Sequence, residues 1–200
     1  MNPPTTGGLR GFKRSLYEGG LRVPAIIEWP EMIQPRVTDF PAVSMDIFPT
    51  LMDVAGIAGK EAIQPQDGQS LLPLLRGDME NREKPIPFSF LEQLVIIDNR
   101  YKFMWVGEKN PRYELYDLIS DPTESKNLVD TNKQVAETMK QKLLEFKDSL
   151  QASIRGEDYL EGKVLPGEPG PTSWMNDVRY QPYLEEWRKR PEFRPWLKKK

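Results

Sequence analysis

The sequence contains no cysteine and no histidine among its 200 residues. The first absence excludes disulfide bonds and thiolate nucleophiles, and the second excludes an imidazole base. Together they exclude a zinc site of the common cysteine and histidine type. A net charge of −2 provides no global field that would attract nucleic acid or a membrane surface.

Long apolar runs are also missing. No stretch approaches the roughly 18 apolar residues that a membrane span needs, and residues 1–6 have neither a basic nor an apolar leader segment. We therefore expect no signal peptide and no membrane span in this chain. The 19 prolines favour many loops over a helical bundle.

Residues 7–30 form a glycine-rich, basic stretch. Up to Ile27 it carries four cations against the single acid Glu18, and the cations are Arg10, Lys13, Arg14 and Arg22. Positive charge on flexible, glycine-containing backbone suits an anionic group such as sulfate or phosphate. A basic, solvated surface loop would have the same composition, so composition leaves both interpretations open.

The order of residues 9–30 resembles the second signature region of the type I, arylsulfatase-like sulfatases of the alkaline phosphatase superfamily. The matching letters are Leu-Arg-Gly-x-Lys-x-x-x-Tyr-Glu-Gly-Gly-x-Arg-Val-Pro-Ala-Ile-Ile-x-Trp-Pro. The resemblance implies that Lys13 is an active-site cation that contacts the sulfate group. It implies that residues 18–24 are mainly scaffold, at the turn into a strand of the main sheet, and it assigns no role to Arg10 or Arg14, which we expect at the surface.

Three later segments, 43–57, 67–77 and 114–128, resemble the same family. Asp46 lies in the first of them and is a candidate catalytic carboxylate, but we interpret it as an acid at a helix start, where the macrodipole favours negative charge. The acids and Asn127 in the third segment could suggest a cation site. Asp121-Pro122 initiates a turn and Asn127 is a plausible cap, so we assign them to turn and capping roles.

Periodicity predicts the elements of the first half. Apolar and β-branched residues predict a strand over 21–29, and prolines predict a loop over 31–41. A helix is expected from Ser44 to Gly56, with Pro49 in its first turns and an apolar face of Ile47, Phe48, Leu51, Met52 and Ala55. The leucines of 67–77 predict a short helical turn, and the charged residues 78–85 predict an exposed linker.

The second half predicts an antiparallel meander with strands at 86–91, 94–97, 101–106 and 113–118 and a tight turn at Asp98-Asn99. Apolar residues at spacings of three and four predict an amphipathic helix over 130–153 that covers one face of this sheet. Beyond Gly156 the chain is rich in proline and tryptophan, and its end is basic. We expect this tail to pack its aromatic side chains on the body, and a nucleic-acid or polysaccharide patch is the alternative.

The predicted fold class is α/β: the C-terminal part of an alkaline-phosphatase-like sulfatase fold, with a small four-stranded antiparallel sheet and a long C-terminal helix. Residues 1–77 would be the end of the catalytic domain, 78–155 a C-terminal antiparallel subdomain, and 156–200 a basic extension. The resemblance covers about residues 7–154.

Sulfatases of this family use a formylglycine made from Cys/Ser-x-Pro-x-Arg, a divalent cation, usually calcium, held by Asp and Asn, and histidine. This sequence has no such motif and no histidine, and it begins after the place of the Asp-Asn pair, so of that constellation only Lys13 is present. We expect no metal ligands in this chain, with Ca²⁺ and formylglycine belonging to the full-length family.

The sequence therefore predicts a C-terminal sulfatase fragment that is inactive alone. Its expected partners are the missing N-terminal sulfatase region and a sulfated small molecule or glycan, and not nucleic acid or a membrane. The resemblance implies a periplasmic or secreted location. Two alternatives stay open: a fragment of a phosphonate or phosphodiester hydrolase, and a non-catalytic module that binds a glycan or a protein.

Overall fold

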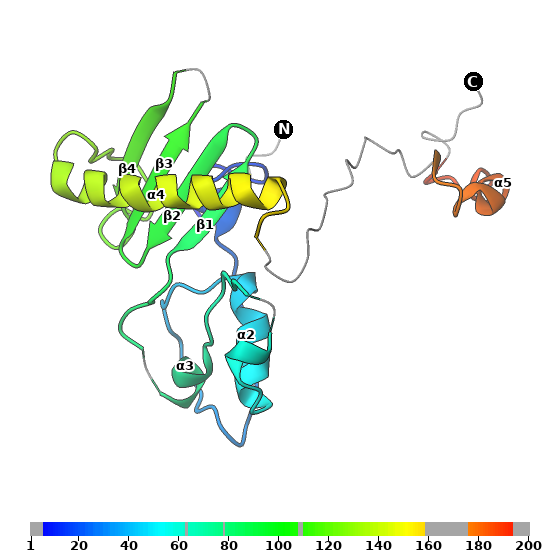
Figure 1. The fold of residues 1–200 in the computed structure, drawn as a ribbon, viewed down its shortest axis with the longest axis horizontal. Coiled ribbons are helices and arrows are strands. Elements are labelled where there is room, and N and C mark those ends of the chain that lie inside the picture. The colour runs from blue at the N-terminus through cyan, green and yellow to red at the C-terminus, as the bar shows by residue number, and fades with distance from the viewer. Residues whose placement is uncertain (1–5, 63, 78, 108–109, 159–175, 194–200) are drawn as a thin grey trace.

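The computed structural model describes residues 6–62, 64–77, 79–107, 110–158 and 176–193. Figure 1 shows a sheet with a long helix lying across it, and below them a second region of loops with two short helices. Within the described residues, no helix combines the length and apolar character needed to cross a bilayer.

The sheet is an antiparallel meander, as predicted. Its strands are β1 (Ile86–Phe90), β2 (Gln93–Asp98), β3 (Tyr101–Val106) and β4 (Arg112–Asp117), in the order β1-β2-β3-β4. Asp98 pairs with Tyr101, so the turn residues are Asn99 and Arg100, one position later than expected. Asn99 has φ of 51°, a left-handed conformation that asparagine tolerates better than most residues.

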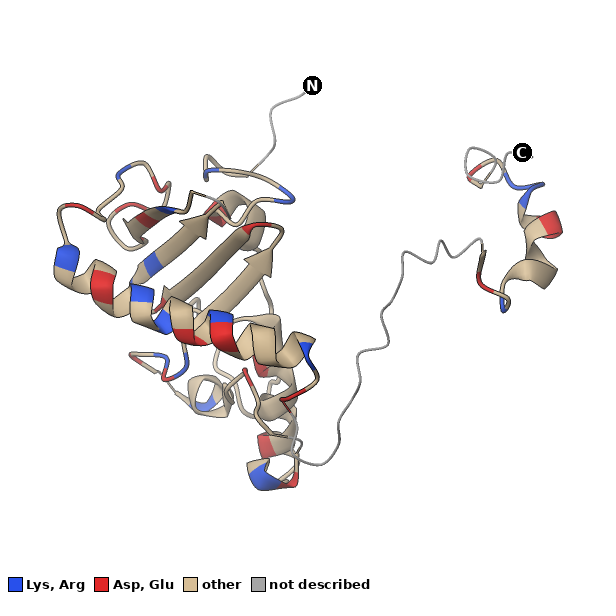
Figure 2. Ribbon diagram, turned by 45° about the horizontal axis from the view of Figure 1, so that its top comes forward, with Lys and Arg blue, Asp and Glu red and all other residues tan. Residues whose placement is uncertain are grey.

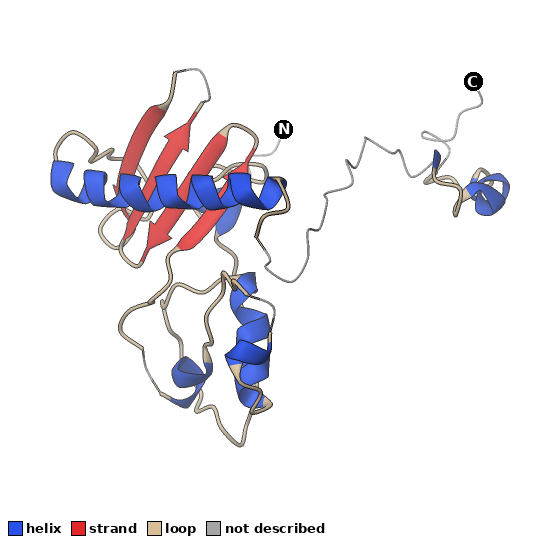
Figure 3. Cartoon of the chain, viewed as in Figure 1, coloured by secondary structure: helices blue, strands red, loops and turns tan. Residues whose placement is uncertain are grey.

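The helix α4 (Lys133–Ile154) covers one face of the sheet (Figure 3). Its buried side chains pack on alternate strand residues, and this core consists of Ile96, Phe103, Leu115, Ala136, Met139 and Leu143. Charged residues of both signs are distributed along α4 (Figure 2). The predicted helix is thus confirmed, although it starts at Lys133 rather than Asp130, because residues 129–131 form a turn.

The second face of the sheet is covered by the N-terminal segment. Leu16 is 5% exposed and packs in a core with Ile86, Val95, Ile97, Met104 and Tyr116. Since both faces are covered, Val95, Ile96 and Ile97 are all buried, which explains the continuous apolar run of β2.

The second region contains η1 (Ser44–Asp46), α2 (Ile47–Val54), η2 (Gly59–Glu61) and α3 (Leu72–Arg76). Pro49 lies in the first turn of α2, and Gly56 follows the helix with φ of +69°, as predicted. The predicted apolar face is largely open, however: Met52 is buried, whereas Ile47, Phe48 and Leu51 are 60%, 55% and 60% exposed.

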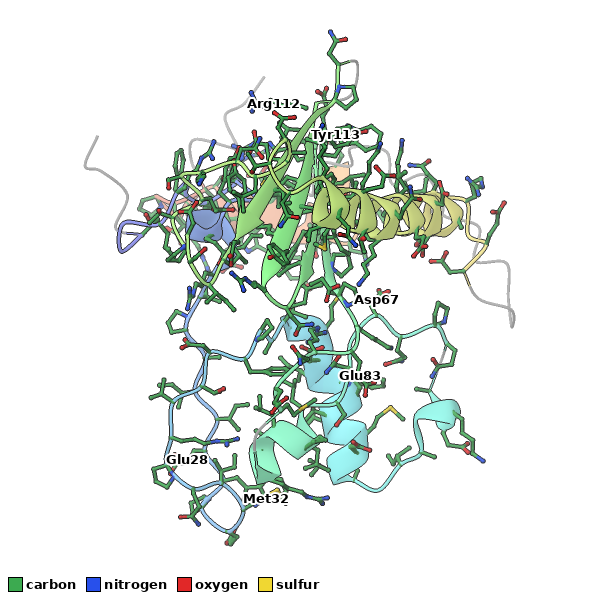
Figure 4. All side chains as sticks on the ribbon, turned by 90° about the vertical axis from the view of Figure 1, so that its left-hand side faces the viewer. Glu28, Met32, Asp67, Glu83, Arg112 and Tyr113 are labelled. Atoms are coloured by element: carbon green, nitrogen blue, oxygen red, sulfur yellow. The ribbon has the colours of Figure 1, made fainter. Side chains whose placement is uncertain are left out.

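The predicted strand over 21–29 is wrong. A four-residue helix, α1 (Glu18–Leu21), is followed by an extended loop in which Ile26 is 95% exposed. A strand needs a neighbour for its backbone groups, and in the described part of the chain β1 to β4 pair only with one another. Figure 4 shows Glu28 and Met32 at the end of the loop region away from the sheet, opposite Arg112 and Tyr113. The predicted loop over 31–41 is confirmed.

The described part of the tail contains η4 (Gln181–Tyr183) and α5 (Leu184–Trp187). The Trp187 ring contacts Tyr180, Tyr183 and Phe193, with centroid distances of 5.9, 5.9 and 5.5 Å. In Figure 1 this segment lies apart from the sheet. The expectation that these aromatic residues pack on the body is therefore not met for the described part of the tail. Trp174 and Trp196 lie outside the described residues.

Candidate functional site

The basic stretch near the N-terminus folds into a closed loop. The Gly19 N–H donates to the Arg10 carbonyl at 2.7 Å, and within the loop the Ser15 N–H donates to the Phe12 carbonyl at 2.9 Å. Lys13 and Arg14 lie at the tip of this loop, and both side chains are exposed. In the part of the chain that the structure describes, the Lys13 ammonium has no hydrogen-bond or ion-pair partner. We call residues 10–19 the lysine loop.

Two glycines allow the lysine loop to close. A Cβ on Gly19 would lie 2.4 Å from the Gly11 carbonyl oxygen, and a Cβ on Gly20 would lie 2.1 Å from the Ser15 carbonyl oxygen. Both distances are shorter than the contacts that Cβ atoms make in proteins, and the neighbouring atoms belong to the backbone, which cannot move aside as a flexible side chain could. The Gly-Gly pair is thus required by close approach of the chain to itself.

Arg10 attaches the start of the lysine loop to the sheet. Its guanidinium donates to the Tyr116 hydroxyl at 2.8 Å, to the Glu124 carbonyl at 2.9 Å and to the Tyr17 hydroxyl at 3.1 Å. It also stacks over the Tyr17 ring, with Cζ 3.8 Å from the centroid. Arg10, which we expected to be an unassigned surface residue, is therefore a structural anchor.

Glu114 of β4 is the common acceptor behind this anchor. The hydroxyls of Tyr17 and Tyr116 both donate to its Oε2 at 2.7 Å, and Arg112 forms an ion pair with its Oε1 at 2.8 Å. Burial alone would raise the pKa of Glu114, but the two hydroxyl donors and the nearby Arg112 and Arg10 charges hold this pKa below its ordinary value. Burial and the adjacent carboxylate raise the pKa of Tyr17 to about 12.

The lowered pKa of Glu114 predicts a pH dependence of stability. A carboxylate with a lowered folded-state pKa stabilises the fold fully above its unfolded value, about 4.3, and this stabilisation is lost as the pH falls through the folded-state pKa. We expect Glu114→Gln to lower stability at pH 7 but to lose less further stability than the wild type between pH 5 and pH 3, measured by urea unfolding. An equal loss in both proteins over this interval would contradict the assignment.

The end of the lysine loop is attached through buried charges. Lys102 of β3 is fully buried, and its ammonium lies 3.0 Å from Oε1 of Glu18 and 2.8 Å from Oε1 of Glu124. Burial raises the pKa of Glu124, and the Lys102 charge offsets this only in part. Glu18 thus has the scaffold role that the resemblance implied.

Asp46 forms a second buried ion pair. Its carboxylate is fully buried and accepts a hydrogen bond from each Nη atom of Arg82 at 2.6 Å. It also accepts hydrogen bonds from the main-chain N–H groups of Val43 and Gln69. Burial alone would raise the pKa of Asp46, but Arg82 and the two backbone donors lower it. Asp46 is therefore structural, as predicted, although through Arg82 and these backbone groups rather than through the helix dipole alone.

Arg82 corrects another prediction. Residues 78–85 were expected to be an exposed linker, but Arg82 is only 3% exposed. Its main-chain N–H donates to Oδ1 of Asn99, and the Asn99 amide donates back to the Arg82 carbonyl. This residue connects the region of α2 and α3 to the turn between β2 and β3. Figure 4 shows Asp67 and Glu83 close to the junction of the two regions.

The third segment of resemblance contains turns, as expected. The Asp121 carboxylate accepts hydrogen bonds from the N–H groups of Ser125 and Lys126. It also accepts hydrogen bonds from the hydroxyls of Thr123 and Ser125. Asn127 does not cap α4; its Oδ1 accepts from the N–H groups of Leu115 and Val129 and so ties the turn to β4.

The acids described above form hydrogen bonds or ion pairs with tyrosines, arginines, a lysine or backbone N–H groups. Among the described residues there is no group of three or more acids that could hold a metal ion. The described residues therefore offer no carboxylate cluster of the kind that holds calcium, and we derive no step through such an ion.

Sequence reasoning missed Lys102, Arg82 and the anchoring role of Arg10. Lys102 did carry a signal: it stands between Tyr101 and Phe103 in a strand, on the same face as Met104. A cation at such a position needs an acidic partner in the core.

The closed glycine-rich loop is thus followed along the chain by an antiparallel sheet that one long helix covers. The model of the family "N-sulphoglucosamine sulphohydrolase, C-terminal" matches residues 10–149. The mouse steryl-sulfatase is 40% identical over 89 residues, which are 43% of this chain and 14% of that protein. The choline-sulfatase of Rhizobium meliloti is 33% identical over 131 residues, 62% of this chain and 25% of that protein.

A solved structure from a study of glycosaminoglycan metabolism by Bacteroides thetaiotaomicron covers 71% of this chain and 32% of its own, with 25% identity and a TM-score of 0.60. The four-stranded antiparallel sheet and the long helix α4 fit the C-terminal part of an α/β sulfatase fold. The chain belongs to the family of N-sulphoglucosamine sulphohydrolase C-terminal regions. It spans between about one seventh and one quarter of the length of the two named curated relatives.

Proposed function

We propose that this chain forms the C-terminal part of a sulfatase that hydrolyses sulfuric esters, and that Lys13 contacts the sulfate group there. The observation that carries the proposal is the lysine loop: a closed, glycine-dependent turn, anchored at both ends, that presents an unpaired ammonium at its tip, as far as the described residues extend. A fixed ammonium can neutralise charge on the sulfuryl oxygens during transfer. A sulfated small molecule or glycan is the proposed substrate.

In this proposal residues 1–77 complete the catalytic domain, 78–155 form the antiparallel subdomain and 156–200 form an extension. The rest of the catalytic domain supplies the formylglycine and the calcium ion. It also covers the apolar side chains that are exposed on α2 and in the extended loop, among them Phe48, Leu51 and Ile26. Exposed apolar groups in such number favour burial against another protein surface.

The isolated 200-residue chain is expected to be inactive toward aryl sulfates, because it contains neither the nucleophile motif nor histidine. The measurement is release of 4-nitrophenol from 4-nitrophenyl sulfate by the purified chain, compared with a full-length sulfatase that contains this segment. Turnover by the isolated chain that disappears in Lys13→Ala would contradict the expected inactivity of the chain alone. Phenylphosphonate monoesters and phosphodiesters, offered to the full-length enzyme, test the alternative hydrolase: preference for these over the sulfate ester would support it.

A further inference from the structure

Both ends of the lysine loop converge on one residue, Glu124. Its side chain accepts the Glu18 N–H at 2.6 Å, and its main-chain carbonyl accepts the Arg10 guanidinium at 2.9 Å. Arg10 precedes Lys13 by three residues and Glu18 follows it by five. Glu124 itself adopts φ of 54°, so its side chain and carbonyl are both directed at the loop from a constrained turn.

Lys102 holds Glu124 and Glu18 together beneath this point. All three side chains are at least nine-tenths buried, and the cluster carries two acids and one cation. Such a cluster is a weak source of stability, since apolar residues of similar size often do as well or better. Its hydrogen bonds, in contrast, are directional and fix where the attached backbone lies.

We infer that Lys102 and Glu124 are positioning residues of the sulfate site: they hold the lysine loop so that Lys13 points to one place. This inference rests on the proposed role of Lys13. It makes the antiparallel sheet a part of the catalytic apparatus through the lysine loop.

The first test measures attachment of the loop in the 200-residue chain by amide hydrogen exchange. Lys102→Met removes the cation at nearly equal length. Because this leaves two buried acids without their cation, some general loss of stability is expected. We expect exchange of the Glu18 and Gly19 amides to speed up at least tenfold more than exchange of the β2 and β3 amides. Glu18→Gln keeps an oxygen for Lys102 and should stay within threefold at every amide. Parallel acceleration of loop and strands in Lys102→Met would overturn the inference, because it would mean general destabilisation.

A second variant covers the case that Lys102→Met does not fold. Tyr116→Phe keeps the ring in the core and removes the hydroxyl acceptor of Arg10, so it should loosen the loop selectively as well. The matched control is Lys140→Met, which breaks the exposed Lys140–Glu137 pair and should change no loop amide. If Lys102→Met folds, unchanged loop exchange in it overturns the inference; if it does not fold, unchanged loop exchange in Tyr116→Phe does so.

The second test is a double-mutant cycle in a full-length sulfatase that contains this segment. If Lys102 acts through Lys13, Lys102→Met lowers kcat/KM at least tenfold alone but less than threefold when added to Lys13→Ala. Equal losses in both backgrounds would overturn the positioning role. If Lys13→Ala alone has no effect on kcat/KM, the proposed role of Lys13 fails, and the proposed effect of Lys102 on catalysis fails with it. The hydrogen-exchange result still decides whether the lysine loop is attached through Lys102.

Discussion

Lys13→Ala is expected to lower kcat/KM by about 10²–10³-fold in a full-length sulfatase that contains this chain. This is the typical cost of removing one group that stabilises an oxyanion in a transition state. Lys13 is exposed at the tip of a loop whose packing is made by Leu16, Tyr17 and Glu18, so the substitution should leave the free energy of unfolding nearly unchanged. The measurement is steady-state kinetics on an aryl sulfate.

The matched control is the neighbouring cation. Arg14 has φ of 76°, so Arg14→Asn removes its charge with a residue that tolerates this conformation. It should keep kcat/KM within about twofold, which corresponds to about 0.4 kcal/mol. If Lys13→Ala also stays within that limit, Lys13 is an ordinary surface lysine and the family assignment of its role is wrong.

Arg82→Met is expected to cost about 3–5 kcal/mol of unfolding free energy, because it leaves the Asp46 carboxylate buried without its cation. The Arg82 and Asp46 side chains are 1% and 0% exposed, and their charged atoms are 2.6 Å apart. The double variant Asp46→Asn, Arg82→Met should recover part of the loss. No unpaired charge remains in it, and the amide oxygen that replaces the carboxylate can still accept one backbone N–H group. Urea unfolding of the wild type and both variants provides the measurement.

An exposed pair serves as the comparison for Arg82. Arg155 and Glu157 are each 55% exposed and lie 2.8 Å apart, and exposed pairs contribute little to stability because water and salt screen them. Arg155→Met should therefore leave the urea midpoint nearly unchanged. A similarly small effect of Arg82→Met would show that the Asp46–Arg82 pair does not hold the two regions together.

The sheet and α4 could be predicted because their signals are local. Residues 86–117 contain short runs of aromatic and β-branched residues that are separated by turn residues. In residues 133–154, apolar residues recur every three or four positions. Predicted and observed strand ends consequently differ by at most one residue, and β2 extends beyond its apolar stretch by Gln93 and Asp98. The start of α4 was harder to predict because helix ends depend on capping contacts.

Three features could not be predicted because they depend on distant residues. A strand over 21–29 has the right composition, but pairing requires a neighbour that composition does not reveal. Arg82 stands among charged residues, and its partner Asp46 is 36 positions away. The lysine loop could be located from the order of its residues, whereas its attachment to Lys102 and Glu124 depends on contacts across 84 and 106 positions.

These separations also set the order in which the chain can assemble. Strands β1 to β4 are neighbours in sequence and can pair as soon as each turn forms, since closing short loops costs little entropy. The lysine loop is synthesised before the sheet, yet its contact with Glu124 must wait for 106 further residues. At about 5–20 residues per second this delay is roughly 5–20 s on the ribosome. The loop that presents Lys13 therefore docks on an already formed sheet, and until then the apolar side chain of Leu16 has no core to enter.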